Sequence, residues 1–80
     1  MNLHLGSMTV GDRGIVTGYT KESRTYRARL LAMGLTRDTS FTVTRLAPLG
    51  DPVEIEVRGF ALSLRREEAA TIMVRREEMV

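Results

Sequence analysis

The sequence lacks cysteine and tryptophan altogether, and it contains one histidine and one lysine in 80 residues. Without cysteine there can be no disulfide bond and no thiolate metal site, which favours a reducing compartment. No apolar run approaches the roughly 20 residues that a membrane-spanning helix needs. Residues 1–6 have neither a basic region nor a long apolar one, so we expect no signal peptide. These absences predict a cytoplasmic protein that is not embedded in a membrane.

The shortage of histidine and cysteine also limits the chemistry that the chain can perform. Transition-metal ions bind to histidine and carboxylates, but His4 has no second histidine or cysteine to join it. The four serines have only His4 as an imidazole base for nucleophilic catalysis. We therefore expect no catalytic residue, no cofactor and no metal site, and we expect that the protein is not an enzyme.

Charges of the two signs nearly balance. Eleven arginines and one lysine oppose ten acidic residues, which gives a net charge of +2. The runs 65–68 and 75–78 each hold two arginines followed by two glutamates, so their charges cancel. A nucleic-acid-binding domain usually carries a larger positive excess on one face. Because Arg24, Arg27 and Arg29 could supply such a charge from one helix, nucleic-acid binding stays an alternative function.

Residues 41–64 carry the clearest structural pattern in the chain. Residues 53–57 alternate valine or isoleucine with glutamate, and this period of two predicts a strand with one buried face. Similar alternation at 41–44 and 60–64 predicts one more strand on each side. Residues 47–52 contain two prolines and a glycine, which predict the loop between the first two of these strands. Together they predict an antiparallel meander.

Four single residues refine this meander. Gly59 suits a tight turn or a bulge between the second and third strands. The apolar phase slips by one at Arg45, which predicts a bulge or sharp bend in the first strand. Phe41 and Phe60 fall on the apolar phase of their strands, so we expect both in the core.

The residues before the meander predict a leader, a turn and a strand. Residues 1–7 show little periodicity and predict a short leader. Gly11 and Gly14 bracket a turn, and residues 15–17 begin the first strand.

An amphipathic helix of about three turns is predicted over residues 24–33, where apolar residues recur at i, i+4 and i+7. Ser23, or alternatively Thr25, is the expected N-cap. Gly34 predicts the end of the helix in the left-handed conformation, with Leu35 folding back onto it. An isolated helix of this length is marginal, so it must pack against the sheet.

The end of the chain predicts one helical turn at 66–70, a last short strand at 71–74 and a polar tail from Arg75 onward. The sum is a mainly β protein with five short strands, one inserted amphipathic helix and a helical turn before the last strand. A sheet this small must curl to close a core, so we expect a five-stranded SH3-like barrel. The chain forms a single domain over 1–80, with its core at about 5–74.

Several stretches along 5–74 are weak singly but specific in this order and spacing. They are RLLAMGL at 29–35, APLGDP at 47–52, GFALSLR at 59–65, Glu68-Ala69 and IMV at 72–74. Together they resemble the FeoA family of bacterial ferrous-iron uptake. The dipeptide Arg37-Asp38 departs from the Pro-Gly that members often have, which changes the preferred turn geometry only.

The resemblance implies an SH3-like barrel without enzymatic activity and a working partner, the membrane transporter FeoB with its cytosolic GTP-binding domain. FeoA-like domains also occur at the C-terminus of iron- and manganese-responsive repressors. This chain lacks the DNA-binding and metal-binding parts of those repressors, so a free-standing protein is expected. A self-associating interaction module is the third alternative. Two surfaces are the candidates for partner binding: the flank of the helix with Tyr26, Arg27, Leu30, Met33 and Leu35, and the hairpin loop with Pro48 and Leu49.

Overall fold

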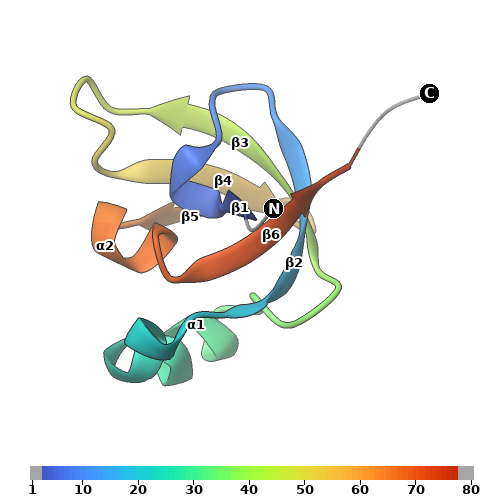
Figure 1. Cartoon of the computed structure of the whole chain (residues 1–80). Helices are drawn as coiled ribbons and strands as arrows, with labels where there is room; N and C mark the ends of the chain where they lie inside the picture. Colours follow the sequence, from blue (N-terminus) through green and yellow to red (C-terminus); the bar gives the residue numbers. More distant parts are fainter. Residues whose placement is uncertain (1–2, 78–80) are drawn as a thin grey trace.

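The computed structural model describes residues 3–77 as one curled antiparallel sheet with short helices (Figure 1). The strand order is β1-β6-β2-β3-β4-β5. Figure 1 shows α1 below the strands and the β3–β4 loop projecting from the barrel. The strands are β1 (Leu3–His4), β2 (Arg13–Tyr19), β3 (Ser40–Leu46), β4 (Val53–Val57), β5 (Phe60–Leu64) and β6 (Ile72–Arg76); the α-helices are α1 (Arg27–Ala32) and α2 (Arg66–Ala69), and the 3-10 helices are η1 (Leu5–Ser7) and η2 (Lys21–Thr25).

The core fills the inside of the curled sheet. Val53, Ile55 and Val57 of β4 are all buried, as the period of two predicted, and α1 contributes the fully buried Leu30. Phe41 of β3 is also buried, as expected. Each fully buried aliphatic or aromatic side chain stabilises the fold by about 1.5–3 kcal/mol, so these contacts hold the helix against the sheet.

The predicted meander is confirmed, including its two irregularities. The β3–β4 register shifts between Val43 and Arg45, where the apolar phase slips. The β4–β5 turn has two residues, Arg58 and Gly59, with φ angles of 53° and 83°. Positive φ at both central positions is typical of the type I′ turn, whose twist matches that of the flanking strands.

Of the expected leader, residues 3–4 form the strand β1 and residues 5–7 the 3-10 helix η1, and residues 1–2 lie outside the described residues. Leu3 pairs with Val74 and His4 pairs with Met73, so β1 covers the edge of β6. The residue after β1, Leu5, is fully buried. A short strand forms here because it satisfies backbone groups of β6 that would otherwise be left unpaired.

The last strand also extends further than expected, into residues that were predicted to form the polar tail. Arg75 and Arg76 belong to β6, where they pair with Ile15 and Gly14 of β2. Hydrogen bonds to β2 therefore extend the last strand beyond its apolar residues. Of the predicted tail, residues 78–80 lie outside the described residues.

We expected Gly14 to border a turn, but it belongs to β2. A Cβ atom on Gly14 would lie 2.8 Å from Cζ of Phe41 and 3.0 Å from the carbonyl oxygen of Arg75. Glycine is required here because the Phe41 ring and the neighbouring strand approach the backbone too closely for any side chain.

The predicted helix divides into η2 and the shorter α1. Ser23 is not the N-cap: it lies buried within η2, and its hydroxyl oxygen accepts a hydrogen bond from Nε of Arg27 at 3.2 Å. The alternative cap, Thr25, is the last residue of η2 and does not cap α1 either. The tighter 3-10 turns bring the chain from β2 into α1 over few residues.

The predicted end of the helix is confirmed. Gly34 has a φ angle of 94°, and its N–H donates to the carbonyl of Leu31 at 3.0 Å. The N–H of Leu35 donates to the carbonyl of Leu30 at 3.1 Å, and both leucine side chains are fully buried. This pair of hydrogen bonds with its apolar contact is the Schellman motif.

Candidate partner-binding surface

Two polar contacts fix α1 in addition to its apolar packing. Arg29 on α1 contacts the carboxylate of Glu68 on α2, and Glu68 is only 2% exposed. The Tyr19 hydroxyl at the end of β2 donates to the carbonyl of Leu35, just after α1. Burial raises the pKa of Tyr19, and the nearby charge of Arg27 partly counteracts that rise. The helix is therefore tied to two sides of the barrel.

The C-terminal end of α1 meets the β4–β5 turn in an open pocket of about 380 Å³. We call it the Met33 pocket, and its lining is mainly apolar. A pocket with one flexible methionine suits an adaptable protein contact. Its lining residues are Ala32, Met33, Gly34, Val57, Arg58, Phe60, Ala61 and Leu62.

Phe60 lies on the surface and not in the core, because the residue is 72% exposed. It occupies the expected apolar phase of β5, but β5 is the last strand of the sheet and pairs only with β4 within residues 3–77. Because no further strand covers this end of the barrel, the Phe60 ring stays exposed although it lies on the apolar face of β5. The result is an exposed aromatic residue beside Met33.

The predicted hairpin loop is confirmed and carries the most exposed large hydrophobic residue of the described part of the chain, Leu49 at 86%. The loop closes through hydrogen bonds from Gly50 N–H to the Ala47 carbonyl (2.7 Å) and from Ala47 N–H to the Pro52 carbonyl (3.2 Å). These bonds hold Leu49 away from the barrel at the tip of the hairpin.

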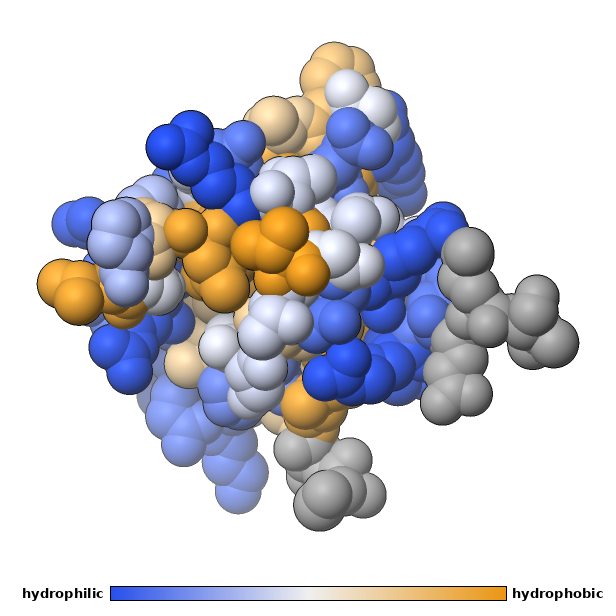
Figure 2. All heavy atoms as spheres, turned by 90° about the horizontal axis from the view of Figure 1, so that it is seen from above, coloured by the Kyte–Doolittle hydropathy of each residue, from blue (hydrophilic) through white to orange (hydrophobic). Residues whose placement is uncertain are grey.

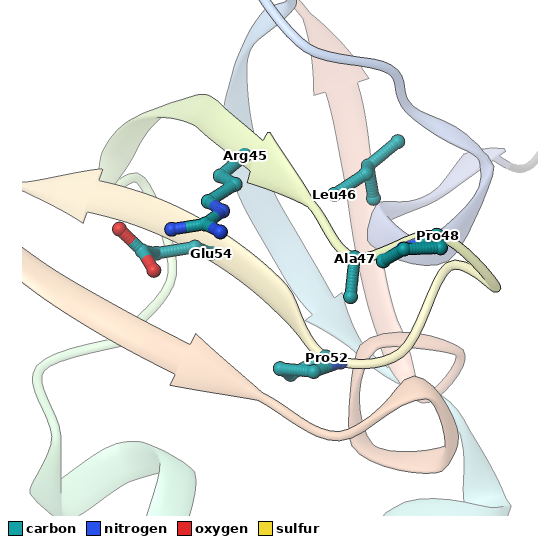
Figure 3. Close-up of a pocket in the computed structure, with 6 residues that line it drawn as sticks. All are labelled: Arg45, Leu46, Ala47, Pro48, Pro52 and Glu54. Atoms are coloured by element: carbon teal, nitrogen blue, oxygen red, sulfur yellow. The ribbon is translucent and has the colours of Figure 1, made fainter.

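The base of the hairpin forms a second open pocket (Figure 3). Figure 3 shows Arg45 and Glu54 side by side on one side of the hairpin, whereas Leu46 points away from them. Pro48 lies at the start of the loop, opposite Pro52.

Figure 2 shows apolar groups gathered within the upper face of the molecule and bordered by polar ones.

The structure does not bring the predicted helix residues together in one cleft. Leu30 and Leu35 are fully buried in the core, so they offer no surface to a partner. Tyr26 faces α2 in a hollow that Glu67 and Ala70 also line. Arg27 lies on another side, with its guanidinium 5.9 Å from the centre of the Tyr19 ring. Of the five helix residues, only Met33 lines the pocket.

Of the residues that line the pocket, sequence reasoning identified Met33 alone, and most of those that it missed are near the β4–β5 turn: Val57, Arg58, Phe60, Ala61 and Leu62. They surround a turn that was predicted, but exposure of that turn depends on the strand order. The absence of charged residues in β5 was the signal available, because Ala61 and Ser63 on its other face only weakly mark the side that meets water.

The described part of the chain has no helix long and apolar enough to cross a membrane. Residues 3–77 likewise contain no group of three or more His, Cys, Asp and Glu side chains that could hold a metal ion. His4, the only histidine, contacts the hydroxyl of Ser7 at 3.1 Å. The expectation that the protein has no cofactor and no catalytic residue stays a prediction.

The architecture is that of a small SH3-like barrel with an inserted helix and an exposed apolar end. The model of the FeoA domain family matches residues 3–76, and the chain belongs to this family. The resemblance noted in the sequence is therefore confirmed, together with the fold that it implies.

Three relatives illustrate the match. The solution structure of an FeoA-like protein from Clostridium acetobutylicum has a TM-score of 0.87 at 30% identity and covers 99% of this chain and 91% of that one. The solution structure of FeoA from Chlorobium tepidum has a TM-score of 0.82 at 40% identity and covers 92% of this chain and 70% of that one. A Porphyromonas gingivalis Fe(2+) transport protein A/Fe(2+) transporter FeoB fusion protein is 35% identical over 72 residues, which are 90% of this chain and 8% of the fusion protein.

A manganese-dependent transcriptional repressor contains the same fold, with a TM-score of 0.86 over 95% of this chain and 37% of the repressor. At 17% identity this likeness concerns the fold alone. The barrel therefore occurs in proteins of different function, and function has to be argued from the surface of this chain.

Proposed function

We propose that this protein is a cytoplasmic, non-enzymatic accessory protein of bacterial ferrous-iron uptake. It binds the cytosolic GTPase region of an FeoB-like membrane transporter and modulates nucleotide turnover, assembly or gating. The observation that carries this proposal is the fusion relative, in which an Fe(2+) transport protein A and an FeoB transporter form one polypeptide. Fusion keeps two domains at a high effective concentration, which is useful when they work in contact.

The surface of the chain supports a protein contact. The Met33 pocket combines an exposed phenylalanine with a methionine, and Leu49 presents a second apolar anchor on the hairpin. Apolar anchors surrounded by polar residues are typical of interfaces, where a few such residues supply most of the binding energy. Arg58 at the rim of the pocket offers a guanidinium to an acidic group of the partner.

Calorimetric titration into the isolated GTPase region of the transporter from the same organism tests the proposal. We expect binding whose affinity differs between GDP and a non-hydrolysable GTP analogue. No binding with either nucleotide, and none to the full-length transporter in nanodiscs, would overturn the proposal.

Two variants locate the contact. Met33→Glu and Leu49→Asp each place a charge on an apolar anchor, and each is expected to weaken binding at least tenfold. Val10→Asp is the matched control, because Val10 is 56% exposed and lines neither the Met33 pocket nor the hairpin pocket. If Met33→Glu and Leu49→Asp both fold and bind as the parent does, the contact lies elsewhere.

A second candidate, nucleic-acid binding, is favoured by one observation. Lys21, Arg24 and Arg27 line one hollow, and Arg27 and Arg37 line the next beside Tyr19, so cations gather near an aromatic ring. Such a site would bind phosphates with a steep dependence on salt. Fluorescence anisotropy measures binding of a single-stranded oligonucleotide at 50 and 200 mM salt. A steep loss of affinity between these concentrations would indicate phosphate binding, whereas the affinity of an apolar protein contact changes little over that range.

A further inference from the structure

The outer edge of β5 has no strand beside it in residues 3–77. The sheet ends with β5. Its ladder with β4 runs from the pair of Val57 and Phe60 at the turn to the pair of Val53 and Leu64 at the far end. At the other end of the sheet, β1 has two residues only, whereas β5 has five. Within residues 3–77, β5 thus presents the strand edge that is long enough to accept another strand.

The backbone groups on that edge can be assigned from the ladder. Val57 and Phe60 flank a two-residue turn and form the closing hydrogen-bonded pair. Because hydrogen-bonded and non-hydrogen-bonded pairs alternate in an antiparallel ladder, Ala61 and Ser63 fall in the non-hydrogen-bonded pairs. Their N–H and C=O groups therefore point away from β4, and both residues are exposed.

This edge lacks three of the features that usually protect edge strands. Natural sheets block their edges with charged residues, proline, bulges or a covering element. Residues 60–64 contain no charge and no proline, and the β4–β5 register runs without a bulge. An edge strand without these features is open to pairing with another chain.

The apolar side of the same edge continues into the Met33 pocket. Phe60 and Leu62 share the face of β5 that carries the buried Leu64, yet Phe60 is 72% exposed and Leu62 is only partly buried. A strand added beside β5 would lay every second side chain along Phe60, Leu62 and Met33. Main-chain hydrogen bonds and a pocket for alternate side chains are the two parts of recognition by β-strand addition.

We infer that the free edge of β5 binds an extended segment of the transporter's cytosolic region as an additional strand. The segment would carry alternating apolar residues and acidic residues near its ends, because Arg58 precedes β5 and Arg65 follows it, and neither forms an ion pair within residues 3–77. A second copy of the chain fits less well. Antiparallel pairing of Ala61 with Ser63 of another copy would bring Arg58 toward Arg66, which is a repulsive contact.

This inference rests on the proposed function, and amide hydrogen exchange of the full chain tests it residue by residue. In the free protein, the Ala61 and Ser63 amides are expected to exchange rapidly while Leu62, bonded to Ile55, exchanges slowly. Addition of the transporter's GTPase region is expected to slow Ala61 and Ser63 at least tenfold.

Proline substitution supplies the matched variants. Ala61→Pro removes an N–H that β4 does not use, so the fold is retained and binding falls at least tenfold. Ala61→Val keeps the N–H and is expected to bind within about twofold of the parent. The Arg58→Asn variant, which suits the positive φ at that position, is expected to lose affinity three- to fivefold.

The outcomes separate the two proposals. Binding without slowed exchange at Ala61 and Ser63, or normal binding by a folded Ala61→Pro variant, overturns the strand addition and leaves the proposed function standing. No binding to the GTPase region or to the full-length transporter overturns both. If the two amides slow when the protein alone is concentrated, the occupant is a second copy and the choice of partner is wrong.

Discussion

The guanidinium of Arg29 on α1 contacts the buried carboxylate of Glu68 on α2, which joins the inserted helix to the short helix before β6. The other carboxylate oxygen of Glu68 accepts the backbone N–H of Arg65 at 2.9 Å. One acidic side chain therefore caps α2 and holds α1. A carboxylate buried in this way depends on these two partners, because little of its own surface is exposed to water.

We predict that Arg29→Gln destabilises the protein by about 1–2 kcal/mol, because it leaves the Glu68 carboxylate without its cation. The loss stays below that of a fully buried pair, since the Arg29 side chain is 59% exposed. Urea unfolding measures it. Arg24→Gln is the control, because Arg24 is exposed and forms no ion pair in the described part of the chain, and it should change stability by under about 0.5 kcal/mol. Equal effects at the two positions would contradict the role of Glu68.

A pair of glycines in β2 gives a second prediction. Gly14→Ala places a Cβ 2.8 Å from Phe41 and should cost about 1–3 kcal/mol through overpacking. At Gly18 the nearest atom to a Cβ is the terminal nitrogen of Arg37 at 3.7 Å, so Gly18→Ala should be neutral or stabilise by up to about 1 kcal/mol. Thermal unfolding of both variants checks the difference. A reversed order would contradict the packing described for Gly14.

Acid pH should weaken the turn before β2. The backbone N–H of Thr9 donates to Asp12 at 2.8 Å, and this bond, together with the charge of Arg76, holds the pKa of Asp12 below its usual value of 3.8. A lowered pKa in the folded state means that the stabilisation is complete above pH 3.8 and is lost as pH falls through the folded value. We expect Asp12→Asn to be less stable than the parent at pH 6 and nearly equal at pH 2. A difference that persists unchanged at pH 2 would assign the effect to packing instead.

Much of the fold was predictable because the strongest pattern is local. The alternation at 53–57 fixes the buried face of β4, and the phase slip at Arg45 marks the bulge in β3. Gly34 likewise ends α1 through contacts within a few residues. Where neighbours along the chain decide the structure, the sequence is sufficient.

The errors occur where distant strands decide. Residues 3 and 4 form a strand only because β6 lies beside them, and Gly14 is required only because Phe41 of β3 packs against it. Phe60 has the phase of a core residue, and its exposure follows from the position of β5 at the edge of the sheet. The candidate surface was missed for the same reason, since only the strand order leaves that edge open.

The two phenylalanines separate stability from function in a single pair of variants. Phe41 is 3% exposed in the core, so Phe41→Ala should lower the free energy of unfolding by about 3–5 kcal/mol. Phe60 is 72% exposed beside Met33, so Phe60→Ala should lower it by less than about 1 kcal/mol while weakening binding to the transporter's GTPase region at least tenfold. Urea unfolding and calorimetry on the same samples measure both quantities. A Phe60→Ala protein that loses stability as Phe41→Ala does would place the ring in the core after all, and one that keeps both stability and affinity would remove Phe60 from the contact surface.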